Sequence, residues 1–513
     1  MNKAAKRFER ETDAFRSMRH LADQAFSRAA GAPLVSGNSV RLLIDAKENY
    51  PAWLDAIAGA QRYIHFESYI IHEDEMGWTF ADALIAKARE GVNVRVIYDW
   101  LGGFGKASRR FWNHLRAGGV DVRCYNPPRL DSPFGWLSRD HRKTITVDGE
   151  IGFVTGLCVG RMWVGEPDKG VEPWRDTGIE VRGPSVANIE QAFARIWDGM
   201  GDRLPADEIR QLDSEATTGE VALRVVPSEP ASAVMLRVDQ LVATLARERL
   251  WLTDAYYAGT TLYVQALRAA AKDGVDVRLL VPSASDIPIL KPLSRSGYRP
   301  LLDSGVRIFE WNGTMLHAKT AVADGKWARV GSTNLNLASW YGNLELDVVV
   351  EDVRFAGEME ETYLRDLENS TEIVLDARRK VRAPKHPMKL RPAMTSGGGT
   401  GGRAAAGAIR IGNAVGAAFT NRRVLEPVEG RLMVLVGLLL LSLAVIGWFF
   451  PRGLAYPLVF LLAWSALALI YRGYKLWTQQ FPRKAMDQET VAGDERPNAS
   501  VSAPVRKQRV KQP

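Results

Sequence analysis

The stretch RDHRKTITVDG, residues 139–149, has a counterpart downstream in MLHAKTAVADG, residues 315–325. In both stretches a lysine stands two residues after a histidine, and an aspartate stands seven residues after it. One such string arises readily by chance, but two copies in matching places of a repeated unit indicate a shared chemical role. The residues concerned are His141, Lys143 and Asp148 in the first copy and His317, Lys319 and Asp324 in the second.

The sequence around these copies repeats at the scale of a domain. The repeated segments are AQRYIHFESYII, ADALIAKAREGVNVRVIYD and HLRAGGVDVRCY in the first half, and ARERLWLTDAYY, VQALRAAAKDGVDVRLLVP and LLDSGVRIFEW in the second. Their apolar spacing predicts strand, helix and strand in turn, with helices ending before Gly91 and Gly274. The two histidines are 176 residues apart, about one domain length. The sequence therefore predicts an α/β protein of two tandem α/β sandwich domains with mainly parallel strands, residues 38–218 and 219–385.

The doubled pattern also predicts a chemistry. On an extended segment a histidine and a lysine two residues apart project from the same face, so each half offers an imidazole beside an ammonium. Two halves together would give two imidazoles and two ammoniums in one cleft, which suits displacement at a phosphodiester. One histidine can attack phosphorus, the other can protonate the departing oxygen, and the lysines can stabilise charge on the phosphate. This division of labour calls for no metal and no cofactor.

These residues carry a resemblance to a known family. The two copies, the second continuing into GSTN with Gly331, Ser332 and Asn334, resemble the doubled HKD signature of the phospholipase D superfamily. Further stretches are similar to its bacterial cardiolipin synthase branch, over about residues 30–375: PLVSGNSVRLL, FESYI, NPPRLDSPFGWLSRDHRK, WRDTGIEVRGP and NLELDVVV. The resemblance implies two phospholipase D-like domains that form one catalytic unit.

The resemblance further implies roles for single residues in a metal-independent phosphatidyl transfer. One of His141 and His317 becomes a phosphohistidine and the other is the general acid and base; the analogy favours His141 as nucleophile and leaves the reverse assignment open. Lys143 and Lys319 would hold the phosphate, and Asp148 and Asp324 would orient the imidazoles. Ser332 and Asn334 would hydrogen-bond the phosphate or its supporting strand, with Glu345 of NLELD as a further supporting carboxylate. The first copy departs from the pattern, since Cys158 stands where Asn is expected.

The C-terminal region predicts attachment to a membrane. Leu432 to Phe450 is a run of 19 residues without a charge, and Leu454 to Ile470 is another of 17. Such lengths suit helices that cross a bilayer, and the short turn between them predicts a transmembrane hairpin, residues 431–472. Arginine and lysine outside both ends place the flanks in the cytoplasm by the positive-inside bias. Around the hairpin, residues 386–430 read as a flexible linker with a short helix and residues 473–513 as a polar basic tail.

Composition limits the remaining choices. The N-terminal segment, residues 1–37, is charged throughout and predicts an amphipathic helix that docks on its own domain, with lipid binding as the alternative. Two cysteines are too few for a disulfide framework. The net charge of +8 suits an anionic partner, and the hairpin favours membrane lipid over nucleic acid.

Taken together, the features predict an enzyme in the bacterial inner membrane, with catalytic domains facing the cytoplasm, that makes cardiolipin from phospholipid substrates, phosphatidylglycerol above all. The sequence does not indicate a protein partner. Three alternatives stay open: a phospholipase D that hydrolyses phospholipids to phosphatidic acid, a phosphodiesterase or nuclease, and a non-catalytic lipid-binding scaffold. The predicted loops before each motif, PPRLDSPFGWL and SDIPILKPL, carry apolar side chains suited to a bilayer interface, which favours lipid.

Overall fold

A computed structural model describes residues 23–129, 137–210, 217–287, 290–375, 381–382 and 427–492. The predicted linker lies almost wholly outside these residues, as do most of the predicted N-terminal helix, most of the loop before the first motif, and the end of the tail. Within the described part of the predicted N-terminal segment, residues 23–30 are helical and Phe26 packs against a core of buried residues. This contact docks the described part of the segment on the second half of the chain, not on the first domain that follows it.

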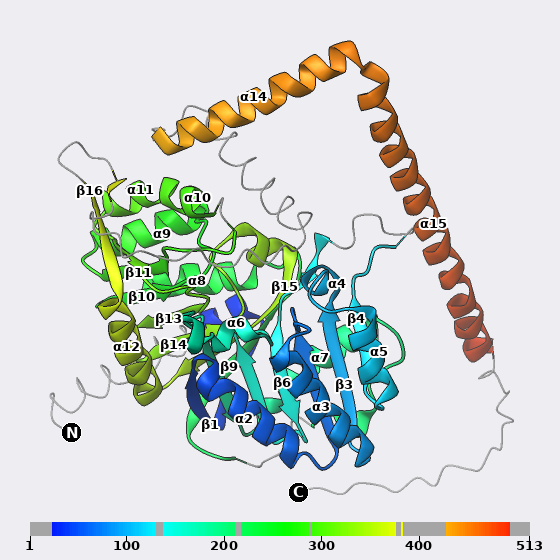
Figure 1. The fold of residues 1–513 in the computed structure, drawn as a ribbon. Coiled ribbons are helices and arrows are strands. Elements are labelled where there is room, and N and C mark those ends of the chain that lie inside the picture. Colours follow the sequence, from blue (N-terminus) through cyan, green and yellow to red (C-terminus); the bar gives the residue numbers. More distant parts are fainter. Residues whose placement is uncertain are drawn as a thin grey trace, which may run out of the picture. The chain divides into compact units, whose positions relative to one another are not determined.

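The first half of the chain contains one mixed sheet with helices on it (Figure 1). Strands β2, β3 and β4 are parallel neighbours, and β6, β7, β8 and β1 continue the sheet from β2 as antiparallel neighbours. The elements are β1 (Val35–Ile44), α2 (Asp45–Gly59), β2 (Tyr63–Ser68), α3 (Glu75–Arg89), β3 (Asn93–Asp99), α4 (Trp100–Gly103), α5 (Arg109–Ala117), β4 (Asp121–Tyr125), β5 (Arg139–Asp140), β6 (Lys143–Val147), β7 (Ile151–Thr155), α6 (Arg161–Val164), η2 (Pro167–Lys169), β8 (Thr177–Arg182), α7 (Val186–Gly199) and η3 (Ala206–Glu208).

The second half repeats this order. Strands β10, β11 and β12 are parallel, and β13, β14, β15 and β9 follow from β10 as antiparallel neighbours. The elements are β9 (Val221–Ser228), α8 (Val234–Leu245), β10 (Arg249–Thr253), α9 (Thr261–Lys272), β11 (Asp276–Pro282), α10 (Leu290–Ser296), α11 (Tyr298–Leu302), β12 (Arg307–Trp311), β13 (Thr320–Ala323), β14 (Trp327–Gly331), the π-helix η4 (Ala338–Gly342), β15 (Asn343–Glu351), α12 (Val353–Glu368), β16 (Ser370–Leu375) and β17 (Val381–Arg382). The predicted repeat is confirmed, but only three strands of each half, β2–β4 and β10–β12, run parallel to one another, so the expected mainly parallel sheets are mixed.

Local sequence accounts for the helices that were predicted in each half. Helix α3 begins after Asp74, whose carboxylate accepts hydrogen bonds from the first turn, and α9 begins after Thr260, whose hydroxyl does the same. The predicted ends of these helices are confirmed, because Gly91 and Gly274 follow them with φ of +94° and +95°. Only glycine adopts this backbone conformation without strain, so it reverses the chain into β3 and β11.

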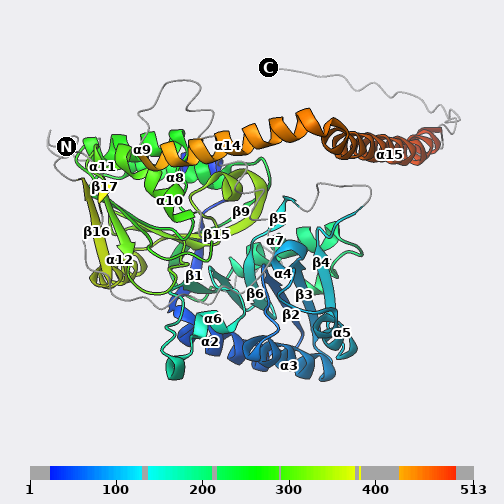
Figure 2. The ribbon, with the colours of Figure 1, turned by 45° about the horizontal axis from the view of Figure 1, so that its top comes forward.

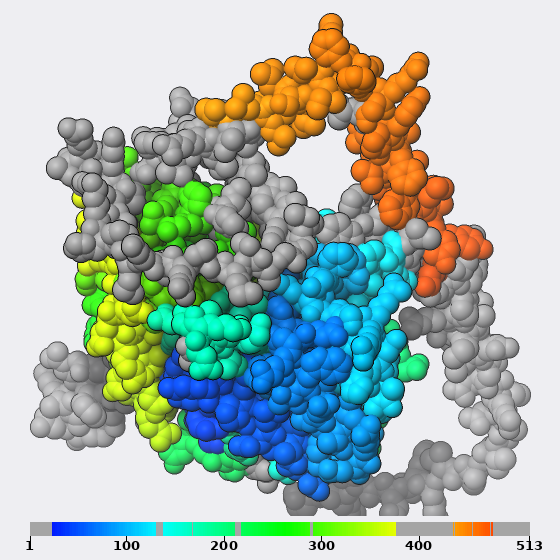
Figure 3. Space-filling view, viewed as in Figure 1, coloured from blue at the N-terminus to red at the C-terminus, as the bar shows by residue number. Residues whose placement is uncertain are grey.

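The two halves share strand pairs and a core. Strand β1 pairs with β9, and β15 pairs in parallel with the short β5. Figures 1 and 2 show β9 and β15 beside the first half, and the two coloured halves adjoin in the space-filling view (Figure 3). One cluster of buried side chains draws on both: Val154, Ile179, Val181, Leu223, Leu316, Val330 and Leu346. The prediction of a single catalytic unit is therefore confirmed.

Two helices form the C-terminal region, α14 (Pro427–Phe449) and α15 (Pro451–Ala492). Among the described residues, the segment Pro451–Lys475 of α15 is long and apolar enough to cross a membrane, with a mean hydropathy of 2.0 over its most apolar window. The corresponding apolar part of α14 that the structure describes, Gly437–Phe449, is shorter. Both helices are thus present, and within the described residues one of the two predicted spans is long enough to cross a bilayer.

Candidate active site

The histidine and lysine of each motif lie where parallel strands of their half end. Lys143 begins β6 and lies opposite Ser68, the last residue of β2. In the second half, Lys319 directly precedes Thr320 of β13. Thr320 lies opposite Thr253, the last residue of β10. The carboxyl ends of parallel strands are the usual place for ligand sites in α/β sheets.

Each histidine is held by the backbone of the other half. The His141 N–H donates to the Leu344 carbonyl oxygen at 2.9 Å, next to the pairing of β5 with β15. The His317 N–H donates to the Arg175 carbonyl oxygen at 2.7 Å, beside a parallel bridge between Arg175 and Leu316. The site is therefore assembled only when both halves are folded together.

The structure brings the two imidazoles and the two ammoniums together, as predicted. Burial first, and then the positive charges of Lys143 and Lys319, hold the pKa of His141 well below its usual value. Burial, followed by the charge of Lys319, lowers the pKa of His317 to about 4, against the opposing effect of Asp176. Both imidazoles are thus neutral near pH 7 without substrate, and a neutral imidazole is the nucleophilic form.

Each lysine lies close to the backbone of the histidine in its own motif. The Nζ atoms of Lys143 and Lys319 each donate to the backbone carbonyl oxygen of the histidine two residues earlier. Both ammoniums are buried, and burial is the main cause that lowers the pKa of Lys319 to about 8. Buried ammoniums attract an anion strongly, because little water screens them.

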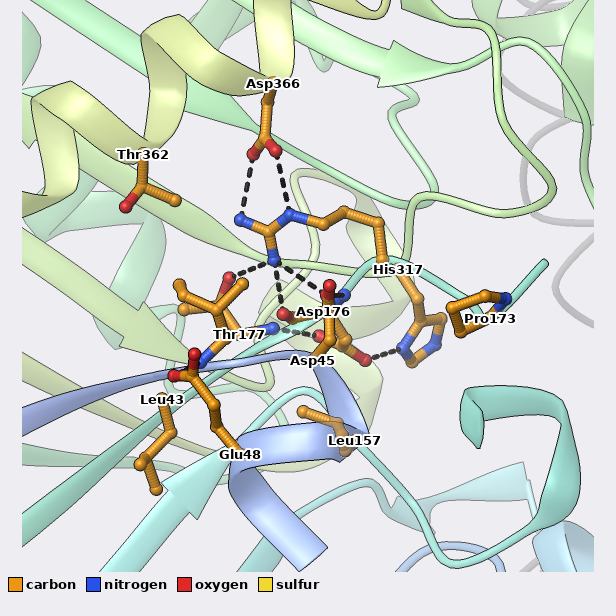
Figure 4. A network of polar contacts seen from close by, with 12 residues as sticks. Leu43, Asp45, Glu48, Leu157, Pro173, Asp176, Thr177, His317, Thr362 and Asp366 are labelled. Carbon is orange, nitrogen blue, oxygen red and sulfur yellow. Dashed lines mark hydrogen bonds and ion pairs between the residues drawn. The ribbon is translucent and has the colours of Figure 1, made fainter. Parts of the chain in front are cut away.

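Two carboxylates are paired crosswise with the histidines. His141 Nδ1 lies 2.8 Å from Glu345 Oε2, so the first-half histidine pairs with a second-half carboxylate. His317 Nδ1 lies 2.7 Å from Asp176 Oδ2, which is the reverse arrangement (Figure 4). Occupation of Nδ1 leaves Nε2 of each imidazole as the nitrogen available to a substrate. Glu345, predicted as a supporting carboxylate, thus lies in contact with His141.

The two pairs differ in charge. Burial raises the pKa of Glu345 to about 7, so this carboxyl is partly protonated at neutral pH. Burial acts in the same direction on Asp176, but the charge and hydrogen bond of His317 outweigh it and lower the pKa of Asp176 below its usual value. The Trp163 indole also donates to Asp176 Oδ2 at 3.1 Å. His317 therefore lies against an ionised carboxylate, which favours its protonated form.

The structure corrects the role expected of Asp148 and Asp324. The Asp148 carboxylate accepts hydrogen bonds from the backbone N–H groups of residues 61–63 at 2.7 to 2.9 Å, and Asp324 accepts from residues 247–249 at 2.9 Å. The physical reason is distance: seven residues of extended chain span about 23 Å, so each aspartate lies at the far end of its strand from the histidine. These aspartates hold the turns after β6 and β13 and do not contact the imidazoles.

Asp176 was missed from the sequence, although a signal for it existed. Asp176 directly precedes β8, which pairs with β7, and Glu345 lies in β15, which pairs with β14. Strands β7 and β14 each follow a histidine motif. Alignment of the halves by strand order, instead of by motif alone, places Asp176 and Glu345 at equivalent positions.

Aromatic side chains that the sequence analysis did not single out surround the site. The ring of Tyr69 lies edge-on to His141 at 4.9 Å between centroids, and Lys143 Nζ lies 5.1 Å from the same ring. The ring of Tyr256 lies 5.6 Å from His317, with Lys319 Nζ 5.7 Å from it. Cations near aromatic faces are stabilised, so these tyrosines help to hold the lysines in place.

The remaining predicted residues lie in the strands beside the site. Ser332 Oγ accepts the Leu346 N–H at 3.0 Å, which supports β15 next to Glu345. Asn334 is buried, and its Oδ1 has no hydrogen-bond partner among the described residues. Cys158 is 2% exposed and burial raises the pKa of its thiol, so it is a packed residue in the place of the expected Asn. Within the part of the chain that the structure describes, no three His, Cys, Asp or Glu side chains gather as metal ligands would.

Comparison with known proteins agrees with this geometry. A family described as "Cardiolipin synthase, PLD-like domain" matches residues 53–197 and 242–367, so that each match contains one histidine motif. The chain belongs to this family.

Individual relatives support the assignment. Cardiolipin synthase A of Pseudomonas aeruginosa is 35% identical over 365 residues, which cover 70% of this chain and 73% of the relative. A cardiolipin synthase of Alkalihalophilus pseudofirmus is 32% identical over 345 residues, 66% of this chain and 68% of the relative. Phosphatidylserine synthase of Haemophilus influenzae has a similar fold, with a TM-score of 0.53 at 14% identity over 70% of this chain and 91% of that one. This member of the cardiolipin synthase family is a phosphatidyltransferase that acts on phospholipids.

Proposed function

We propose that this enzyme makes cardiolipin by transferring a phosphatidyl group to phosphatidylglycerol through a phosphohistidine on His141. The observation that carries the proposal is the crosswise pairing, in which each neutral imidazole has its Nδ1 held by a buried carboxylate and its neighbour is a buried ammonium. In the proposed complex the two Nε2 atoms face one phosphate.

In the first step His141 Nε2 attacks the phosphorus of the donor lipid. The bond from phosphorus to the headgroup oxygen breaks, and His317 gives its proton to that oxygen, so the headgroup leaves as an alcohol. The negative charge of the bound phosphodiester and the ionised Asp176 both raise the pKa of His317, which allows it to begin protonated. Lys143 and Lys319 stabilise the charge on the non-bridging oxygens.

In the second step the headgroup hydroxyl of phosphatidylglycerol attacks the same phosphorus. His317, now neutral, takes the hydroxyl proton while the bond between phosphorus and His141 breaks. Cardiolipin leaves and both histidines return to their starting states. If the donor is also phosphatidylglycerol, the alcohol released in the first step is glycerol.

The membrane supplies both lipids in this proposal. The segment Pro451–Lys475 supports a membrane attachment, and we propose that α14 and α15 form the predicted hairpin. Arginines and lysines flank the hairpin on both sides in the sequence, which supports an orientation with the catalytic unit at the cytoplasmic face of the inner membrane.

Product analysis tests the function. The purified full chain is reconstituted in phosphatidylglycerol vesicles, and lipids and released glycerol are measured over time. We expect cardiolipin and glycerol in equal amounts. Phosphatidic acid as the only lipid product would show a hydrolytic phospholipase D instead. Cleavage of DNA or RNA with no change in lipid would contradict both lipid functions.

A further inference from the structure

One side of the site carries groups that the two steps above do not use. The His317 ring lies 5.7 Å from each of the Trp163 and Trp174 rings and 5.6 Å from Tyr256. Trp163 is buried and holds Asp176, whereas Trp174 and Tyr256 are partly exposed. Both rings therefore lie beside His317 and are partly open to solvent, so a substrate at His317 can contact them.

An exposed carboxylate, that of Asp286, lies next to Tyr256. The Tyr256 hydroxyl donates to Asp286 Oδ1 at 3.0 Å, and Ser285 Oγ lies 3.5 Å from the same oxygen. Among the described residues no group bonds Asp286 Oδ2, and the side chain is exposed. An ionised carboxylate is an acceptor only, so Asp286 can take hydrogen bonds from hydroxyl groups of a bound molecule.

The proposed role of His317 determines which part of a lipid would lie beside Trp174 and Tyr256. If His317 is the general acid and base, its Nε2 contacts the headgroup oxygen that leaves in the first step and the hydroxyl that attacks in the second. The rest of that headgroup must then extend from His317 along neighbouring surfaces. Trp174 and Tyr256 offer faces for its carbon atoms, and Asp286 offers an acceptor for a headgroup hydroxyl that does not react.

We propose that Trp174, Tyr256 and Asp286 form a subsite for the glycerol headgroup of the acceptor lipid and so favour a polyhydroxy alcohol over a simple alcohol or water. The subsite rests on the proposed function, because it assigns the alcohol side of the reaction to His317. Bound glycerol would also displace water from the space beside His317, which limits hydrolysis of the phosphohistidine.

A competition between two acceptors tests the subsite. The full chain in vesicles receives phosphatidyl-p-nitrophenol as donor, with glycerol and 1-propanol together in solution, and the ratio of phosphatidylglycerol to phosphatidylpropanol is measured. Both products come from the same phosphatidyl enzyme, so the ratio does not depend on how fast that intermediate forms. Release of p-nitrophenol is followed separately.

Two variants and a control give the expected results. Asp286→Ala removes the acceptor, and we expect the product ratio to fall about tenfold, the effect of one charge-assisted hydrogen bond. Tyr256→Phe keeps the ring but removes the hydroxyl that positions Asp286, so a smaller fall is expected. The control is Asp273→Ala, at an exposed aspartate after α9, which should keep the wild-type ratio.

The outcomes distinguish a failure of the subsite from a failure of the proposed function. An unchanged ratio in Asp286→Ala, at any rate of p-nitrophenol release, overturns the subsite. An equal fall in Asp273→Ala also overturns it, because the effect would then come from surface charge alone. If wild-type protein releases no p-nitrophenol and makes no cardiolipin, the proposed function fails instead.

Discussion

At the scale of single residues, the two histidines have unequal surroundings. His317 lies against an ionised Asp176 and three aromatic rings, whereas His141 lies against Glu345, whose pKa is raised to about 7, and the ring of Tyr69. The charged partner favours a proton on His317. This difference supports His317 as the acid and base, and His141 as the nucleophile.

The raised pKa of Glu345 makes stability depend on pH. Its folded pKa of about 7 lies above the unfolded value of 4.5, so the proton stabilises the fold below pH 4.5 and this contribution is lost as pH rises through 7. Glutamine stays neutral throughout. The melting temperature of Glu345→Gln relative to wild type should therefore rise between pH 5 and pH 8, and the matching gain in unfolding free energy has a limit on the order of 3 kcal/mol. Thermal unfolding of the full chain in detergent micelles measures it, and a difference that does not vary with pH would contradict the assignment.

At the scale of elements, the aspartate of each motif fastens a hairpin. Asp148 has a positive φ of 55° in the turn between β6 and β7, and its carboxylate binds the N–H groups at the start of β2. The turn is thereby fixed to the neighbouring strand. Asp324 has a φ of 51° and makes the equivalent contacts at the start of β10.

Replacement of Asp148 should therefore act on stability and not on the chemical step. Asp148→Ala leaves three backbone donors without their acceptor, and we expect a loss of about 3 kcal/mol in unfolding free energy. Turnover measured well below the melting temperature should stay within a few-fold of wild type. A variant with an unchanged melting temperature and no turnover would show that Asp148 takes part in the reaction.

The sequence predicted one helix in each half, α3 and α9, but not the direction of the antiparallel strands. Strands β6 and β7 are buried along their whole length, as parallel strands usually are, and the alternation of threonine with Ile145 and Val147 in β6 fits a strand of either direction. The same limit applies to the site. His141 and Lys143 stand in a repeated motif, whereas Asp176 lies outside the motif and emerges only when the two halves are aligned strand by strand.

At the scale of the whole molecule, Arg175 joins the two halves next to the site. Its guanidinium binds both oxygens of Asp366 on α12 at 2.9 Å, and also Asp45 at 3.3 Å and the Thr177 hydroxyl at 2.9 Å. Figure 4 shows Asp366 of the second half on one side of this network, and Asp45 and Asp176 of the first half on the other. The residue after Arg175 is the carboxylate that holds His317.

Loss of this contact should destabilise both halves together. Asp366→Ala leaves part of the buried guanidinium charge unpaired, and we expect a cost of about 3 kcal/mol and a single lowered thermal transition. The matched control is Glu372→Ala, which breaks the exposed pair with Arg307 and should cost less than about 1 kcal/mol. Equal small effects of the two variants, or separate transitions for the two halves, would contradict the account.

Membrane attachment belongs to the same scale. If the hairpin is the principal anchor, a chain that ends before Arg431 should leave the membrane fraction while keeping its fold, since the paired strands all lie earlier in the sequence. Fractionation with a high-salt wash measures this, with the full chain as control. Full retention of the shortened chain would contradict the anchor, and salt-sensitive retention would point to basic surfaces instead.

The most direct test of the central claim is to trap the phosphatidyl enzyme. With phosphatidyl-p-nitrophenol as donor the leaving group needs no proton, so His317→Ala should still form the covalent intermediate but resolve it slowly. Rapid mixing should therefore give a burst of about one p-nitrophenol per enzyme, and mass spectrometry should find the phosphatidyl group on His141. His141→Ala should give neither burst nor adduct. A burst in His141→Ala with the adduct on His317 would reverse the assignment, and the absence of an adduct in both variants, with turnover retained, would contradict a phosphohistidine mechanism.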